Sequence, residues 1–207
     1  MKNLKTYIKD YIVESAWDIE DNIEDDNKEL VLNEVKKFIN DNYINFNIKN
    51  CEFIFDEKKN KYVINCNQQV TLKSSVATQL TNDLFEWGTV WNFNCTNNDK
   101  LTSLKGAPKE VGAGFSCSEC LKLKSLEGAP ETVGGNFYCR ACPELKTLQG
   151  APKTVGGSFN CKGCPDLTSL KGAPKTVEKD FDCYDCPNLH SLDGIGKVKG
   201  KIFSDIG

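Results

Sequence analysis

The apolar positions between Phe93 and Ile202 recur with a period of 22 residues. Each copy starts with a Phe-x-Cys triplet, continues with two leucines three residues apart, and closes on a valine. The triplets start at Phe93, Phe115, Phe137, Phe159 and Phe181, and their cysteines are Cys95, Cys117, Cys139, Cys161 and Cys183. A repeat this short buries its apolar face only against its neighbours. The pattern therefore predicts a solenoid of five 22-residue repeats plus a partial one.

Within a copy, Phe-x-Cys predicts a short strand with two inward side chains, because alternate residues of a strand point to opposite faces. Stacked coils would align these strands in a parallel sheet with a spacing of about 4.8 Å. The leucines, such as Leu123 and Leu126, would fill the middle of the coil. Gly-Ala-Pro, present in four copies, would turn the chain, since Gly permits unusual dihedral angles and Pro fixes φ.

The chain before the repeat starts with two predicted helices. Residues 3–17 have the apolar spacing of one helix face. That face consists of Leu4, Tyr7, Ile8, Tyr11 and Ile12. An acidic run at 18–26 follows, and a second helix is predicted over 27–41, with Asp25 or Asp26 placed to cap it.

Between the helices and the repeat the period changes to two. Alternating apolar residues at 44–48 predict a strand, and the runs 51–55 and 61–66 predict a hairpin around the polar turn 56–60. Ile64-Asn-Cys66 has the form of a first, degenerate Phe-x-Cys unit, and a short helix is expected near 75–86.

These elements predict an α+β protein in which N-terminal helices and a β-hairpin cap precede a short leucine-rich-repeat-like parallel β solenoid. The expected divisions are an N-terminal helical region at 1–42, a β-hairpin and helix cap at 43–90, and the solenoid at 91–207. A cap is expected because a solenoid needs atypical end units to cover its open core. At the other end, a last strand with an unpaired edge at Ile202 offers a surface for self-association.

Composition narrows the function classes. The formal net charge is −3 and no basic cluster occurs, so direct nucleic-acid binding is not expected. No run of eighteen apolar residues occurs, and the N-terminus lacks the apolar core of a secretory signal. We therefore expect a cytoplasmic protein with no membrane association, whose eleven cysteines are buried thiols.

Four copies carry Cys-x-x-Cys, with pairs at 117/120, 139/142, 161/164 and 183/186. This spacing fits Cys₄ zinc sites. However, the first copy has Asn98 at the second cysteine position, where an amide would hydrogen-bond the turn backbone. We interpret the pairs as two stacked ladders and expect no metal, no cofactor and no enzymatic activity. A zinc-binding or redox protein using the CxxC pairs stays an alternative.

The repeat resembles leucine-rich repeats, as in Phe137-Tyr-Cys139-Arg-Ala-Cys142-Pro-Glu-Leu145. Its Phe-x-Cys and Gly-Ala-Pro motifs are similar to those of repeat proteins found in bacteriophage and bacterial genomes. The resemblance covers about residues 90–204 and implies the fold; it says nearly nothing about function, because repeat scaffolds host many partners.

The outward residues of the predicted strands vary between copies, whereas the inward ones do not. Tyr and Arg are frequent interface anchors, and both occur among these outward residues. We call the predicted protein-binding surface the strand face, and it consists of Tyr138, Arg140, Asn160, Lys162, Asp182 and Tyr184.

The expected function is a non-enzymatic protein–protein interaction module, phage-encoded, with an inhibitor of a host defence system such as CRISPR as its sharper version. It would act in the host cell cytoplasm on a protein partner. The alternative is a virion or head-packaged protein, because the N-terminal residues resemble leader peptides cut after a hydrophobe-x-Glu motif such as Ile12-Val13-Glu14. The Leu4–Ile12 face could also serve as a partner-docking helix.

Overall fold

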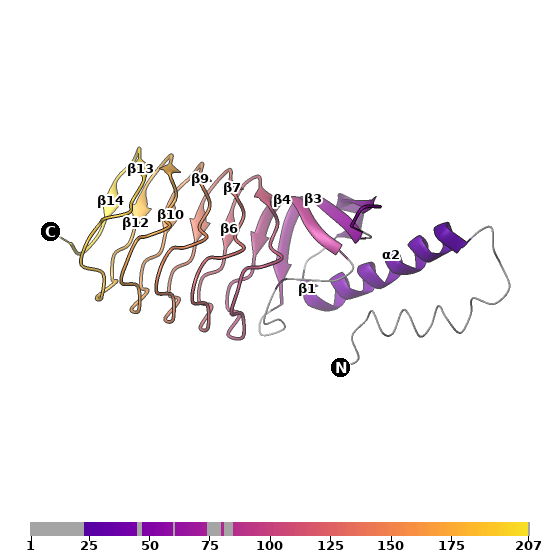
Figure 1. Ribbon diagram of the computed structural model, residues 1–207, viewed down its shortest axis with the longest axis horizontal. Helices are drawn as coiled ribbons and strands as arrows, with labels where there is room; N and C mark the ends of the chain where they lie inside the picture. The colour runs from indigo at the N-terminus through magenta and orange to yellow at the C-terminus, as the bar shows by residue number, and fades with distance from the viewer. Residues whose placement is uncertain (1–22, 45–46, 60, 74–79, 81–84, 207) are drawn as a thin grey trace.

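The computed structural model describes residues 23–44, 47–59, 61–73, 80 and 85–206. Helix α2 and a group of longer strands lead into a stack of similar coils, which ends at the C-terminus (Figure 1). The leading elements are α2 (Ile23–Asn42), β1 (Tyr43–Ile44), the 3₁₀ helix η1 (Ile48–Asn50), β2 (Cys51–Asp56), β3 (Lys61–Leu72) and β4 (Phe85–Asn94). The predicted α+β architecture with a parallel solenoid is confirmed.

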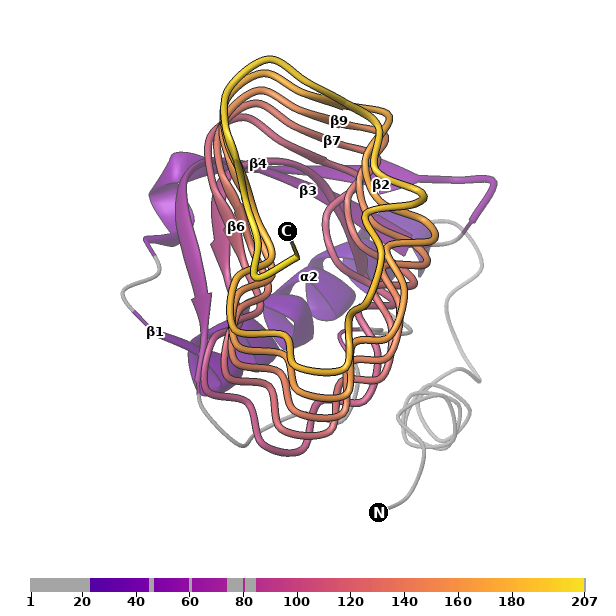
Figure 2. The same cartoon turned by 90° about the vertical axis from the view of Figure 1, so that its left-hand side faces the viewer.

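Strand β4 starts both sides of the solenoid. Its Val90 pairs in parallel with Val111, and its Phe93 pairs in parallel with Phe115. One series of strands continues from the first pairing, namely β5 (Glu110–Val111), β7 (Thr132–Val133), β9 (Thr154–Val155), β11 (Thr176–Val177) and β13 (Lys197–Val198). The other continues from the second, namely β6 (Phe115–Ser116), β8 (Phe137–Tyr138), β10 (Phe159–Asn160), β12 (Phe181–Asp182) and β14 (Ile202–Phe203). Viewed along the stack, successive coils follow nearly the same path (Figure 2).

The predicted internal ladders are confirmed. Phe115, Phe137 and Phe159 are buried, and neighbouring rings stack with centroids 5.1 to 5.2 Å apart and planes 7° and 1° from parallel. The centroid spacing follows the strand spacing of about 4.8 Å, because each ring is fixed to its own strand. The Cys and Leu ladders beside the rings are likewise buried from Cys95 and Leu101 to Leu189, and Leu192 is partly buried.

The turn of each coil requires its glycine. Gly128 and Gly150 both have φ of +89°, a left-handed conformation that strains any other residue. A Cβ on Gly150 would lie 2.5 Å from the Glu127 Cα of the coil before. Gly194 occupies the same position in the last coil, with φ of +94°, although Ala and Pro no longer follow it.

Helix α2 covers the core at the N-terminal end of the stack, where Figure 2 shows it crossing behind the coils. Val35 and Ile39 are fully buried, and Phe38 packs edge-on against Phe85 of β4. The helix predicted over 27–41 is confirmed, but it begins at Ile23. Asp25 and Asp26 therefore lie inside the helix, and the prediction that one of them caps it was wrong.

The hairpin of β2 and β3 is confirmed, with antiparallel pairs from Cys51–Cys66 to Asp56–Lys61. The strand expected at 44–48 is not continuous, because Asn47 caps η1 by accepting a hydrogen bond from the Lys49 N–H. The short helix expected near 75–86 falls largely outside the described residues, and Phe85 already belongs to β4.

Two compensating irregularities join β3 to β4. Ile64 pairs with Trp87, and Cys66 pairs with Val90. Between these two pairs β3 advances by two residues and β4 by three, so β4 bulges at Gly88 and Thr89. From Cys66 to Gln69, β3 then advances by three residues while β4 advances by two, from Val90 to Asn92. The residue aligned with Phe93 is consequently Val70, and the prediction that Ile64-Asn-Cys66 is the first degenerate repeat unit was wrong.

Cys51 and Cys66 face each other across the hairpin and form a disulfide. The expectation that all eleven cysteines are thiols was therefore wrong for this pair. The nine other cysteines are free and buried, as expected.

Candidate functional site

The structure brings the six strand-face residues together on three adjacent coils. In-register pairing of β8, β10 and β12 places Tyr138, Asn160 and Asp182 in one row. Backbone bonds from Ala141 N to Lys162 O and from Gly163 N to Tyr184 O continue the register. Arg140, Lys162 and Tyr184 therefore form a second row, and all three are exposed.

Contacts within the strand face divide five of its six residues into two groups. Asn160 Oδ1 accepts a hydrogen bond from the Lys162 N–H, and its Nδ2 donates to Asp182 Oδ2 at 3.0 Å. Asp182 Oδ1 in turn accepts from the Tyr184 N–H. Asn160 and Asp182 are therefore partly committed to holding the backbone, a role that sequence reasoning did not assign to them.

The side chains of Arg140, Lys162 and Tyr184 make fewer contacts within the protein than those of Asn160 and Asp182. The Lys162 Nζ lies 5.3 Å from the centroid of the Tyr184 ring, a cation–π geometry. Arg140 has no hydrogen bond or ion pair of its guanidinium among the described residues. This row presents two cations and one aromatic ring to solvent on a rigid support.

The cysteine pairs form the two ladders that the sequence predicts. Each second cysteine donates its S–H to the carbonyl of the first cysteine one coil back, as from Cys142 Sγ to Cys117 O at 3.3 Å. Asn98 is fully buried and donates instead to Cys95 O at 3.0 Å. Its Oδ1 has no hydrogen-bond partner within the described part of the chain.

Burial keeps the thiols of the later coils neutral. It raises the pKa of Cys139 and Cys161 well above the ordinary value, and that of Cys164 to about 12. A neutral thiol is neither a good nucleophile nor a zinc ligand, since both need the thiolate. No group of three or more His, Cys, Asp or Glu side chains suited to a metal ion occurs in the part of the chain that the structure describes. The arrangement supports packing more than metal or redox chemistry.

The N-terminal candidates, Leu4, Tyr7, Ile8, Tyr11 and Ile12, and the motif Ile12-Val13-Glu14, lie outside the described residues. At the other end of the chain, β14 pairs with β12 through Phe181 and Ile202. Ile202 and Phe203 are 43% and 45% exposed, so the end of the stack presents apolar surface.

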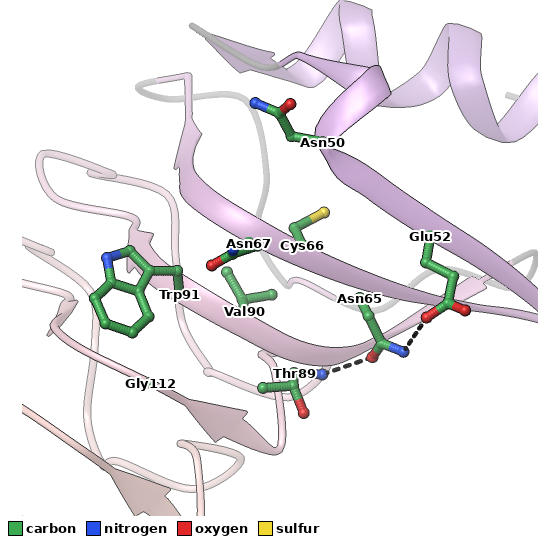
Figure 3. A pocket seen from close by; sticks show the side chains of 9 residues that line it. All are labelled: Asn50, Glu52, Asn65, Cys66, Asn67, Thr89, Val90, Trp91 and Gly112. Atoms are coloured by element: carbon green, nitrogen blue, oxygen red, sulfur yellow. Dashed lines mark hydrogen bonds between the residues drawn. The ribbon is translucent and has the colours of Figure 1, made fainter.

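Sequence reasoning missed a pocket at β2, β3 and β4 (Figure 3). Its volume is about 290 Å³. We call it the Trp91 pocket, and it is lined by Asn50, Glu52, Asn65, Cys66, Asn67, Thr89, Val90, Trp91 and Gly112.

The β4 bulge creates this pocket. Strict alternation from Phe85 and Trp87 to Phe93 would bury Trp91, but the extra residue in β4 turns Val90 inward and leaves Trp91 51% exposed. A usable signal was present in the sequence, because Trp91 stands at the corner where later copies carry glycines such as Gly112 and Gly134.

Comparisons with family models, with curated proteins and with solved structures find no match. The geometry of the surfaces therefore carries the functional argument. No helix among the described residues has the length and apolar character needed to cross a bilayer.

Proposed function

We propose that this protein is a non-enzymatic protein-interaction module that binds a protein partner through the strand face. The observation that carries the proposal is the exposed row of Arg140, Lys162 and Tyr184 on three consecutive coils. The residues beneath it are constant from copy to copy, whereas the row itself changes from coil to coil. Constant interior positions maintain the fold, and variable exterior positions are free to determine specificity.

The chemistry of the row indicates what the partner offers. Arg and Tyr are enriched among residues that dominate binding energy at interfaces. Two cations next to each other favour carboxylates on the partner, and the Tyr184 ring provides an apolar contact beside them. The backbone of each coil is hydrogen-bonded to the next, so the row needs little ordering on binding.

The finer version of the proposal rests on the resemblance of the repeat to phage and bacterial repeat proteins. In that version the protein is phage-encoded and inhibits a host defence system such as CRISPR from within the host cytoplasm. The alternative is a virion or head-packaged protein, in which Ile12-Val13-Glu14 is a processing site and the exposed end at Ile202 and Phe203 supports self-association. Mass spectrometry of purified particles separates these two versions, because only the second places the chain in the virion.

The strand face is tested with the triple variant Arg140→Ala, Lys162→Ala, Tyr184→Ala. The full chain serves as bait, and the partner retained by the wild type is identified after cross-linking. We expect the variant to keep its fold and to lose that partner by at least about a hundredfold in affinity, since removal of interface anchors typically costs about 2 kcal/mol or more each.

The matched control is Lys171→Ala with Lys175→Ala. It removes two exposed cations that lie outside the strand face. A partner that the control retains and the triple variant loses supports the proposal. Equal retention by both variants contradicts it.

A further inference from the structure

The Trp91 pocket is built by two glycines. A Cβ on Gly88 would lie 2.1 Å from Asn65 Oδ1, and a Cβ on Gly112 would lie 2.9 Å from Trp91 Cε3. Asn65 therefore lies over one glycine and the indole ring lies over the other. The positions of Asn65 and Trp91, two of the lining side chains, therefore depend on glycine at 88 and 112.

One wall of the pocket is fixed by hydrogen bonds, which Figure 3 shows as dashed lines. Asn65 Oδ1 accepts from the Thr89 backbone N–H at 2.9 Å, and Asn65 Nδ2 donates to Glu52 Oε2 at 3.4 Å. Glu52 keeps its other carboxylate oxygen for a ligand. The wall is thus preorganised, which lowers the entropy cost of binding.

Several polar groups around the pocket have no partner among the described residues. They are the Trp91 indole N–H, the Asn67 amide and the Thr89 hydroxyl. Together with Glu52 they provide both donors and acceptors next to an exposed aromatic surface. The volume of about 290 Å³ lies just below the range of small-molecule pockets, which span roughly 300–1,000 Å³.

The lining decides which ligands fit. Among the nine lining residues there is no Lys, Arg or His, and the carboxylate of Glu52 is the one charged group, so an anionic ligand would be repelled. Glu52 and Trp91 stand at opposite ends of the pocket, with Val90 and Asn67 between them (Figure 3). A single ammonium group therefore cannot contact both the carboxylate and the indole face.

We propose that the Trp91 pocket binds a neutral saccharide. A sugar ring has an apolar C–H face, which packs on the indole of Trp91, and a rim of hydroxyls that both donate and accept hydrogen bonds. Asn67 and Thr89 bind hydroxyls beside the indole, and Glu52 accepts one at the far end. Saccharide binding goes beyond the proposed function, because none of the residues that line the Trp91 pocket belongs to the strand face.

The probes are maltotetraose, cellotetraose and chitotetraose, each added to the isotope-labelled full chain. The readout is the indole N–H signal of each of the three tryptophans in an NMR spectrum, with the Trp91 signal assigned from Trp91→Phe. We expect at least one probe to shift the Trp91 signal and to leave that of Trp87 in place, because Trp87 is buried and donates to the Tyr43 hydroxyl.

Trp91→Ala is expected to reduce the affinity for that probe by at least about tenfold. The matched control is Leu121→Ala, which removes an apolar side chain of similar exposure, 50% against 51%, outside the pocket and the strand face, and leaves the affinity unchanged. If Trp91→Ala does not fold, Asn67→Ala combined with Thr89→Val tests the same site, and the expected loss of affinity is again about tenfold.

Three results overturn the proposal. One is the absence of any Trp91 shift with all probes at about 10 mM, beyond the range of specific binding. Another is equal affinity in the wild type and in the pocket variants. The third is a Trp91 shift with tetralysine and none with a saccharide, which would make the pocket a contact site for a basic protein segment.

Discussion

Phe159→Ala removes an interior ring of the phenylalanine stack. Phe159 is fully buried, and its ring centroid lies 5.2 Å from that of Phe137 and 5.1 Å from that of Phe181. Truncation of a buried Phe to Ala costs about 3–5 kcal/mol. Because Phe159 has a stacked neighbour on each side, we expect a loss of unfolding free energy at the upper end, about 4–5 kcal/mol.

A second substitution separates stacking from burial. Phe159→Leu keeps an apolar side chain in the core and loses both stacked pairs, each of which contributes about 0.5–1.5 kcal/mol beyond its buried area. We expect Phe159→Leu to cost about 1–3 kcal/mol. The control is Phe203→Ala in the last coil, where the ring is 45% exposed, and there we expect a cost of about 1 kcal/mol.

The assay is urea unfolding of the three variants and the wild type, followed by circular dichroism and by amide hydrogen exchange. Exchange is needed because coils contact only their neighbours, so the coils around residue 159 can open without the rest. A cost below about 2 kcal/mol for Phe159→Ala, or one equal to that of Phe203→Ala, would refute the described packing of the stack.

Three further predictions concern the turns and the cysteines. Gly150→Ala should cost more than about 1 kcal/mol in urea unfolding, because φ is +89° and the new Cβ would meet the Glu127 backbone; Ala151→Gly is the control, and an equal cost would contradict the reasoning. The denatured, unreduced chain should titrate nine thiols and the reduced chain eleven. Loss of the Cys51–Cys66 bond, with a sequence separation of 15, should lower the unfolding free energy by about 3 kcal/mol. Eleven thiols without reduction would disprove the bond. Unfolding free energy should be nearly constant between about pH 6 and pH 8 and should fall at higher pH. Burial raises the folded pKa of Cys139 and Cys161 above the unfolded value of about 8.5, so only the unfolded chain loses these protons. A urea midpoint unchanged to pH 10 (on the order of one unit above that value) would contradict this.

The solenoid could be predicted from sequence because each coil buries the same residue types against its neighbours. Phe137, Cys139 and Leu145 recur at fixed positions, and a stack places identical residues on top of one another, so periodicity alone identifies the core. The same comparison identified the strand face, since outward positions are the ones that vary. It could not show that Asn160 and Asp182 hold the backbone, because those bonds depend on turn geometry.

The cap was harder to predict because its details depend on strand register. The bulge in β4 reverses the alternation that otherwise indicates burial, so strict alternation would place Trp91 in the core, whereas its side chain is exposed in the structure. The opposite irregularity in β3 aligns Val70 with Phe93 in place of Ile64. The Cys51–Cys66 bond depends on hairpin register in the same way, and the pattern of eleven cysteines dominated by the repeats gave no indication of this pair.

Both series of strands start at β4, and this arrangement makes the length of the stack independent of the structure of the Trp91 pocket. Because both series of strands start from this one strand, removing a whole coil further along shortens them equally and leaves β2, β3 and β4 unchanged. Duplication or deletion of a 22-residue unit can therefore alter the reach and the outer residues of the stack in a single genetic event. A change within β4 has no such freedom, since it disturbs the Trp91 pocket and the origin of both series together.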